Sequence, residues 1–221
     1  GEAIEFNHHW QLNEGTKKTP DMEKVCILKF DKTRKDRADI ALRNFNKMRT
    51  LKHPDILSYV DGVDLEATFI MIVTEPCIPL SKWLKDKVEE RQNSDQSREE
   101  LNKSIVQEIT WGIKCILSGL NFLHTQANLG HGYLGLHAIF VTPNGDWKIG
   151  SFDLACNISL HEDETFFKRY NAYLGNQYMS PERANIDRGD ILFRKAFGVI
   201  DIFSLARIIE ESFSILSVQV P

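Results

Sequence analysis

Residues 131–153 read HGYLGLHAIFVTPNGDWKIGSFD and hold two short apolar runs separated by a turn. Ile139-Phe140-Val141 and Trp147-Lys148-Ile149 have the composition of strands, and Pro143-Asn144-Gly145-Asp146 lies between them. Asn-Gly is favoured in tight hairpin turns because both residues tolerate the positive φ angles that such turns require. This stretch therefore predicts a β-hairpin.

The residues on either side of the hairpin predict a mainly helical half of the chain. A long helix is expected over residues 101–124, with Leu117 on its buried side, and a last helix over residues 199–212. Pro79 opens a shorter helix. Residues 89–100 read as an exposed loop and residues 153–180 as irregular. The four tryptophans are predicted to be core residues: Trp10, Trp83, Trp111 and Trp147.

The N-terminal third predicts strands and one helix. Residues 25–30 (VCILKF) form a buried strand, and a helix begins near Ile40. That helix ends before His53-Pro54, because the residue before a proline avoids helical dihedral angles. Residues 56–60 and 68–73 are predicted as two strands of a hairpin that turns at Asp61-Gly62. A strand-rich small half and a helical large half suggest two lobes with a cleft between them.

Composition excludes several classes of function. The 221 residues carry a net charge of −4, which gives no general attraction to nucleic acids. The four cysteines are widely spaced, which argues against zinc and for buried thiols in a reducing compartment. No apolar run is long enough to span a membrane, and no secretion signal is seen at the start of the chain. We expect a soluble cytoplasmic domain.

Seven segments, in order along the chain, resemble protein kinases. They are VCILK (25–29), like the strand with the phosphate-binding lysine; LKHPDIL (51–57), like the segment after the regulatory helix; IVTE (72–75), like the strand entering the hinge; HGYL (131–134), like the catalytic loop; WKIGSFD (147–153), like the strand leading to Asp-Phe-Gly; YMSPE (178–182), like the end of the activation segment; and DIFSL (201–205), like the buried helix beyond it. The resemblance implies one α+β, bilobal protein-kinase-like domain over residues 1–221. Its small antiparallel-sheet lobe with one regulatory helix would be residues 1–75, and its mainly helical large lobe, truncated at the C-terminal end, residues 76–221.

The same resemblance shows which phosphoryl-transfer groups are missing. Asn44 stands at the regulatory-helix glutamate, Tyr133 at the catalytic-loop aspartate, Ala138 at the catalytic-loop asparagine and Ser151 at the aspartate of Asp-Phe-Gly. No glycine loop is present, because residues 10–24 contain only Gly15. These residues supply neither the charge nor the metal ligands that the reaction needs. We therefore expect no catalytic residue, no metal site and no enzyme: the chain reads as a pseudokinase.

Lys29 is the one charged residue that could still meet a nucleotide phosphate, and Glu75 and Cys77 are candidate nucleotide contacts in the hinge. No cofactor is expected, but two alternatives stay open through Lys29. One is a divergent kinase that also uses the displaced acid Asp153. The other is a sensor that binds ATP without transferring phosphate.

Packing residues of the kinase fold are kept where charges are lost. His131 and Phe152 stand at positions of the internal apolar stack, Met48 and Tyr59 at its upper members, and Asp201 at the anchor of the catalytic loop. The arginine that receives an activation-segment phosphate is Gly132. The acidic run at residues 162–164 is interpreted as a solvated surface.

Among pseudokinases, the chain most resembles the N-terminal-kinase-like (Scy-like) proteins. The residues that carry this likeness include Trp10-Gln11-Leu12 in place of a glycine loop, the His-Gly-Tyr loop at residues 131–133, and residues 145–150 (GDWKIG). The resemblance implies a protein-interaction scaffold in vesicle traffic at Golgi and endosomal membranes. Its partners would be other proteins, such as coat and trafficking proteins, and membrane association would be peripheral, through those partners.

Overall fold

The computed structural model describes residues 4–5, 10–66, 68–93, 97–157, 161–171, 176–185 and 193–216. Its N-terminal half is an antiparallel five-stranded sheet in the order β1-β2-β3-β5-β4. The strands are β1 (Ile4–Glu5), β2 (Trp10–Thr16), β3 (Lys24–Asp31), β4 (Tyr59–Leu65) and β5 (Phe69–Thr74). Helix α1 (Ala38–Thr50) packs near β4 and β5 and ends before His53-Pro54, as the sequence predicted.

The predicted turn at Asp61-Gly62 is wrong, because both residues lie within β4 and pair with β5. The register shifts between Tyr59 and Asp61, which marks a bulge. A Cβ on Gly62 would lie 2.6 Å from the carbonyl oxygen of Met71. Gly62 therefore allows β4 and β5 to approach each other closely. A glycine can have this role within a strand as well as in a turn.

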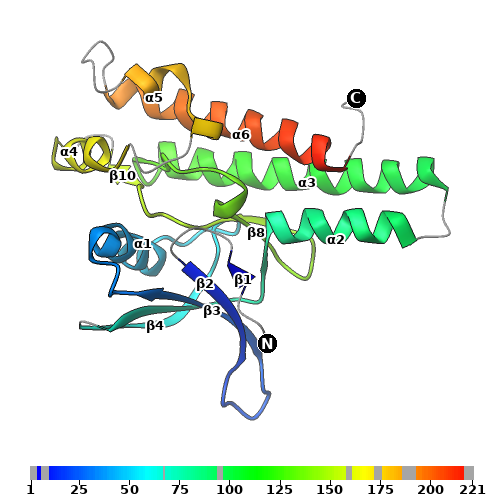
Figure 1. The fold of residues 1–221 in the computed structure, drawn as a ribbon, viewed down its shortest axis with the longest axis horizontal. Helices are drawn as coiled ribbons and strands as arrows, with labels where there is room; N and C mark the ends of the chain where they lie inside the picture. Colours follow the sequence, from blue (N-terminus) through cyan, green and yellow to red (C-terminus); the bar gives the residue numbers. More distant parts are fainter. Residues whose placement is uncertain are drawn as a thin grey trace.

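The second half is built on three long helices. They are α2 (Leu80–Asn93), α3 (Arg98–Thr125) and α6 (Phe193–Leu216), and α6 runs alongside α3 (Figure 1). Most of the loop predicted at residues 89–100 is helical instead. Ser97 is the N-cap of α3: its Oγ accepts from Glu100 N at 3.3 Å and donates to Glu100 Oε2 at 2.9 Å.

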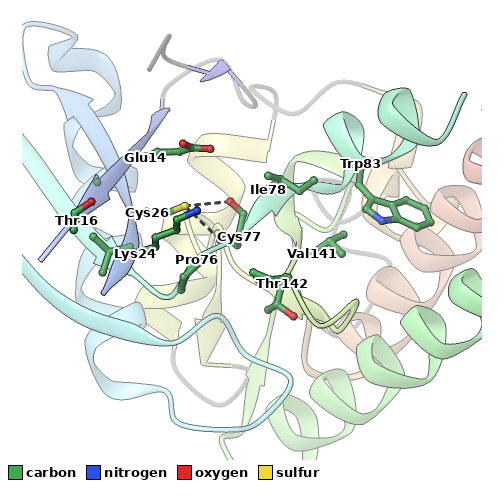
Figure 2. A pocket seen from close by; sticks show the side chains of 13 residues that line it. Glu14, Thr16, Lys24, Cys26, Pro76, Cys77, Ile78, Trp83, Val141 and Thr142 are labelled. Atoms are coloured by element: carbon green, nitrogen blue, oxygen red, sulfur yellow. Dashed lines mark hydrogen bonds between the residues drawn. The ribbon is translucent and has the colours of Figure 1, made fainter. Parts of the chain in front are cut away.

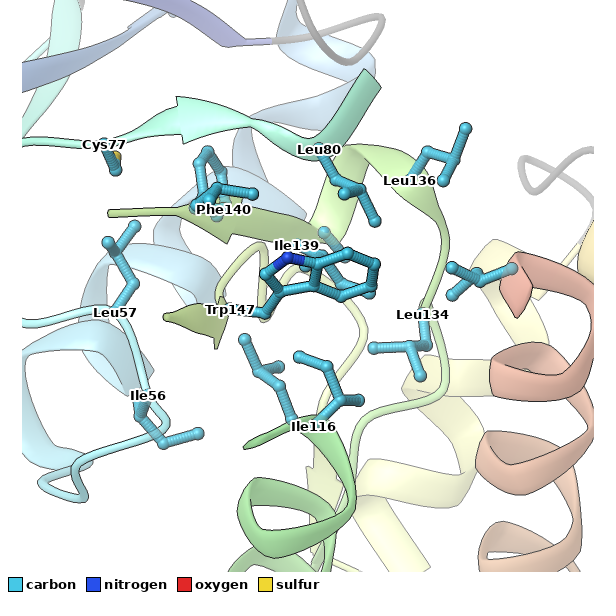
Figure 3. Packing of buried hydrophobic residues seen from close by; sticks show 14 of the residues in the cluster. Ile56, Leu57, Cys77, Leu80, Ile116, Leu134, Leu136, Ile139, Phe140 and Trp147 are labelled. Atoms are coloured by element: carbon cyan, nitrogen blue, oxygen red, sulfur yellow. The ribbon is translucent and has the colours of Figure 1, made fainter. Parts of the chain in front are cut away.

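The hairpin of the opening stretch is present with the predicted bounds. Strands β8 (Ile139–Val141) and β9 (Trp147–Ile149) pair with each other, and β8 also pairs with β6 (Ile78–Pro79). Trp147 lies at the centre of a buried cluster that includes Ile116 of α3 (Figure 3). A Cβ on Gly112 would lie 2.1 Å from Cδ2 of Trp147, so α3 makes room for the indole with a glycine.

Two further predictions are corrected in this half. Residues 153–180, predicted irregular, contain β10 (Cys156–Asn157), which pairs with β7 (Leu129–Gly130), and helix α4 (His161–Tyr170). Trp111 and Leu117 of α3 are 48% and 46% exposed rather than buried. The short elements that complete the description are 3-10 turns η1 (Lys35–Arg37), η2 (Leu136–Ala138) and η4 (Asn176–Tyr178), and α5 (Pro181–Asn185).

Candidate functional site

Trp10 closes the space between the sheet and the segment that follows β9. Its side chain is 1% exposed, and its ring centroid lies 5.6 Å from that of Phe30 on β3. The indole Nε1 donates a hydrogen bond of 2.9 Å to Asp153 Oδ1. Trp10 is the first residue of β2, the strand that follows the position of a kinase glycine loop. Its indole fills the cleft at this position.

Lys29 does not face this cleft. Alternate residues of a strand point to opposite faces of the sheet, and Cys26, Leu28 and Phe30 are the buried set in β3. Lys29 is exposed on the other face, where its Nζ lies 5.0 Å from the centroid of the Phe69 ring. The structure therefore contradicts the prediction that Lys29 can meet a phosphate. The interior position beside it belongs to Leu28, which carries no charge.

Asn44 links α1 to the segment after β9. Its side chain is 1% exposed, and its Oδ1 accepts a hydrogen bond of 2.8 Å from the backbone N–H of Phe152. An amide can make this bond without the desolvation cost of a buried carboxylate. The residue predicted at the position of a catalytic ion pair thus serves as an internal connection.

Tyr133, Ala138 and Ser151 are also committed to internal contacts. The ring of Tyr133 lies 4.2 Å from that of His137, and burial, with nearby Asp153 second, raises the pKa of its phenol well above the ordinary value. Ala138 is fully buried, and its carbonyl accepts from Gly150 N at 2.8 Å. Ser151 has φ 53° and donates from Oγ to the carbonyl of His137 at 3.2 Å. None of these three side chains presents a carboxylate or carboxamide oxygen to the cleft.

Asp153 is the displaced acid that a divergent kinase would use in place of the missing metal ligand or base. It is fully buried, and burial raises its pKa from 3.8 to about 7 against the opposing hydrogen bond from Trp10. Its second oxygen, Oδ2, has no hydrogen-bond partner. Within the described residues, no cluster of three His, Cys, Asp or Glu side chains could hold a metal ion. Asp153 is therefore enclosed beneath an indole rather than presented to a substrate.

The apolar framework of the fold is retained around these positions. Asp201 of α6 accepts hydrogen bonds of 2.8 Å from the backbone N–H groups of both His131 and Gly132, which confirms its predicted anchoring role. The rings of His131 and Phe152 lie 5.3 Å apart, and both side chains are fully buried. Burial lowers the pKa of His131. A neutral ring then accepts at Nδ1 from Tyr133 N and donates at Nε2 to the carbonyl of Gly150.

A cavity of about 460 Å³ remains beside the hinge (Figure 2). Its lining residues come from β2 and β3, the hinge, α2 and the β8–β9 turn: Glu14, Gly15, Thr16, Lys24, Val25, Cys26, Pro76, Cys77, Ile78, Trp83, Val141, Thr142 and Pro143. Cys77 lines it, but Glu75 does not: its carboxylate pairs with Lys148 Nζ at 2.9 Å and accepts from Ser58 N at 2.9 Å. The backbone N–H and C=O of Cys77 are both taken by the Cys26 sulfur, at 3.3 and 3.1 Å.

Sequence reasoning missed a clamp between α4 and α1. Asp163 lies within the acidic run that was interpreted as a solvated surface, yet it is buried and its Oδ1 accepts from Nη1 of Arg43 at 2.8 Å. Nη1 also donates to the carbonyl of Ala155, and the guanidinium lies 3.8 Å from the Phe166 ring centroid. These residues are far apart in the sequence, so no local pattern marks the pair.

The sequence and the fold of this chain are similar to those of known proteins. The family model described as the protein kinase domain matches residues 15–215. A Dictyostelium discoideum protein named "Probable inactive serine/threonine-protein kinase scy1" is 34% identical over 174 residues, which is 78% of this chain and 19% of that protein. The Saccharomyces cerevisiae "Protein kinase-like protein SCY1" is 30% identical over 64% of this chain and 18% of its own length.

Two other matches extend the comparison. The mouse "Protein-associating with the carboxyl-terminal domain of ezrin" is 27% identical over 86% of this chain and 24% of its own length. A solved structure, "Crystal structure of Cex1p", superposes with a TM-score of 0.61 at 20% identity, over 90% of this chain and 40% of that one. This last likeness shows the fold alone. The chain spans about a fifth to a quarter of the length of the curated relatives named here.

Proposed function

Because this chain belongs to the protein kinase family and has relatives among the Scy1 proteins, we propose that it is a pseudokinase domain that transfers no phosphate and acts by binding other proteins. The observation that carries the proposal is the Trp10–Asp153 contact. It fills the cleft where an active kinase holds nucleotide phosphates and encloses Asp153, the displaced acid of the Asp-Phe-Gly region.

The charges around this contact support the same conclusion. Phosphoryl transfer needs cations beside the phosphates and carboxylates that hold metal ions. The interior positions in the cleft are instead Leu28, Asn44, Ala138 and Ser151, and all four are buried. Loss of a single group can be compensated by a neighbour, but here the cation and the metal ligands are absent together among the described residues.

The mode of action proposed for the chain is protein binding in vesicle traffic at Golgi and endosomal membranes. The Scy1 relatives and the ezrin-associating relative support a role through protein partners, since the latter's name states such an association. Exposed apolar side chains on the helical half, Trp111 and Leu117 of α3 and Val199 and Ile202 of α6, are surfaces that a protein partner can cover. No helix within the described ranges is long and apolar enough to cross a membrane. We propose that membrane association is peripheral and passes through coat proteins.

A thermal-shift assay with Mg·ATP, with and without magnesium, tests the loss of nucleotide chemistry. The expected result is a melting temperature unchanged by nucleotide, while an active kinase domain assayed in parallel is stabilised. No phosphate should be incorporated from labelled ATP. Lys29→Ala is the matched variant and should behave like the parent protein, because Lys29 faces away from the cleft.

The hinge cavity favours one second candidate, a sensor that binds nucleotide without transferring phosphate. The cavity has the volume of a small-ligand site and a lining that is mainly but not wholly apolar. A nucleotide-dependent rise in melting temperature without labelled phosphate would support this sensor and reject the closed cleft. Phosphate incorporation that Lys29→Ala abolishes would instead support a divergent kinase.

A further inference from the structure

Two of the four free cysteines lie together at the edge of the hinge cavity. Cys26 is in β3 and pairs with Thr74 of β5, and Cys77 follows Thr74 by three residues. Both cysteines line the cavity, and Figure 2 shows the Cys26 sulfur directed at the backbone of Cys77. The two cysteines are buried, with 4% and 5% of their surface exposed, but the cavity they line is also lined by the exposed residues Glu14, Lys24 and Pro143.

The hydrogen bonds between these residues place them within reach of a disulfide. The Cys26 sulfur accepts from Cys77 N at 3.3 Å and lies 3.1 Å from the carbonyl oxygen of Cys77. The Cys26 sulfur therefore touches the backbone of the residue whose sulfur it would join, and a disulfide between them needs Cα atoms about 4.4–6.8 Å apart. The Cys77 sulfur lies 3.9 Å from Thr74 Oγ1, a weak contact that does not prevent its rotation.

The surroundings divide the two thiols into an attacking and a resolving partner. The side chain of Cys77, joined by its backbone N–H and opposed by burial, lowers the pKa of Cys26 to about 7. The Cys26 side chain, followed by burial, raises the pKa of Cys77 well above its ordinary value. Burial also raises the pKa of the two remaining cysteines, to about 12 for Cys156 and above 9 for Cys115. Cys26 is assigned as the attacking thiol because its sulfur accepts the backbone N–H of Cys77, a hydrogen bond that favours the thiolate, whereas the Cys77 sulfur makes a weak contact with Thr74.

We propose that Cys26 and Cys77 form a peroxide-sensitive dithiol that closes to a disulfide beside the hinge cavity. The Cys26 thiolate attacks hydrogen peroxide, the O–O bond breaks, and Cys26 sulfenic acid and hydroxide form. The Cys77 thiol then attacks the sulfenic sulfur, the S–O bond breaks, and water leaves as the disulfide forms. In sum, two thiols lose two electrons and two protons, and one peroxide becomes two waters.

Oxidation changes the hydrogen bonding of the hinge beside the cavity. Once its sulfur is bonded to Cys77, Cys26 no longer has a thiol hydrogen to donate to the Cys77 carbonyl. The new bond also ties β3 to the hinge, so that the sheet and the segment leading to α2 become covalently linked. In a reducing compartment such a bond would be transient and would report oxidant exposure.

Peptide mapping tests the proposal directly. Trypsin places each cysteine on its own peptide, at residues 25–29, 53–82, 115–148 and 149–168. After brief treatment of the intact protein with excess hydrogen peroxide and alkylation of remaining thiols, we expect a cross-linked pair of the first two peptides that dithiothreitol releases. Before oxidation, Cys26 should react with iodoacetamide about tenfold faster than Cys115 or Cys156, as its larger thiolate fraction predicts.

Variants separate the steps. Cys77→Ser should lose the cross-link and accumulate a dimedone-reactive sulfenic acid on the 25–29 peptide, whereas Cys26→Ser should lose both products. Cys115→Ser, which removes a thiol outside the cavity, should leave the cross-link unchanged. Equal oxidation of all four peptides, a cross-link that includes 115–148 or 149–168, or an unreactive Cys26 in the folded protein would each overturn the proposal.

Discussion

Trp10 joins the two halves of the molecule through one side chain. Its indole occupies buried volume beside Phe30 and supplies the hydrogen bond that Asp153 Oδ1 accepts. Trp10→Ala removes both contributions and should lower the free energy of unfolding by about 3–5 kcal/mol, the cost of truncating a buried large aromatic residue. Trp10→Phe keeps most of the packing and should cost about 2 kcal/mol through the lost hydrogen bond.

Urea unfolding followed by circular dichroism measures both variants. The difference between them separates volume from hydrogen bonding at this position. If Trp10→Phe were as stable as the parent protein, the bond to Asp153 would contribute nothing and the cleft would be closed by packing alone.

Asp153 gives the protein a pH dependence of opposite sign to that of most carboxylates. Its pKa is about 7 in the folded state and 3.8 ordinarily, so the folded state binds the proton more tightly. The resulting stabilisation is fully present below pH 3.8 and is lost as the pH rises through 7. Asp153→Asn removes this titration. Between pH 4.5 and 7, the variant should therefore gain stability relative to the parent by about 1 kcal/mol per pH unit.

The readout is the slope of that difference, obtained from urea unfolding at each pH. Any constant cost of the amide, such as an unpaired N–H, shifts all points equally and leaves the slope unchanged. A difference that does not vary with pH would show that Asp153 titrates normally.

At the level of elements, the structure ties α4 to α1 through Arg43 and Asp163. Both side chains are largely withdrawn from solvent, with exposed fractions of 18% and 13%, so salt screens the pair less than a surface ion pair. Asp163 Oδ2 also accepts from Asn157 N at 2.5 Å. We expect a double-mutant cycle with Arg43→Ala and Asp163→Ala to give a coupling energy of about 1–3 kcal/mol.

Hydrogen exchange shows which elements lose stability when the Arg43–Asp163 pair is broken. Each single variant should raise exchange in α4 and leave α3 protected. The control is Asp86→Asn, which breaks the more exposed Lys82–Asp86 pair of α2 and should change stability by less than about 0.5 kcal/mol. Additive effects of the two clamp variants would mean that Arg43 and Asp163 do not act as a pair.

The accuracy of the sequence predictions differs from element to element, for physical reasons. The hairpin β8–β9 was predicted with the correct bounds, because its turn residues and apolar runs are local signals. The predicted bounds of β3 differ from the observed ones by one residue at each end. The resemblance nevertheless placed Lys29 in the cleft, whereas the alternation of side chains along the strand places Leu28 there. A one-residue offset in a strand reverses the face of the side chain, whereas the same offset at a helix end changes little.

Other parts of the site depend on contacts between distant residues. Asn44 was assigned its position from spacing, but its bond to Phe152 N follows from how α1 packs. The hydrogen bond from Trp10 to Asp153 joins residues 143 positions apart, so no local pattern marks it. Trp111 and Leu117 fit the helical period of α3 yet remain exposed, since period alone does not say which neighbour covers a face.

Across the whole molecule, links from the small half converge on the segment that begins at β9. Ile149 exchanges two backbone hydrogen bonds of 2.9 Å with Asp55 and Leu57, which follow α1. Phe152 N donates to Asn44, and Asp153 accepts from Trp10. An enzyme that admits and releases nucleotide must open between its lobes, whereas these bonds hold the two halves together at successive positions along one short segment.

Cooperative unfolding of both halves is the expected consequence. The amides of Leu57, Ile149 and Phe152 should exchange only through global unfolding, with the same free energy and the same urea dependence as the core of α3. Native-state hydrogen exchange at increasing urea measures this. Trp10→Ala is the informative variant, because loss of the indole should lower protection at all three amides together while the halves stay coupled. Protection of Ile149 and Phe152 that disappeared at low urea, with α3 still protected, would reveal a lobe-opening motion. The cleft would then be dynamically accessible despite being closed in its native contacts.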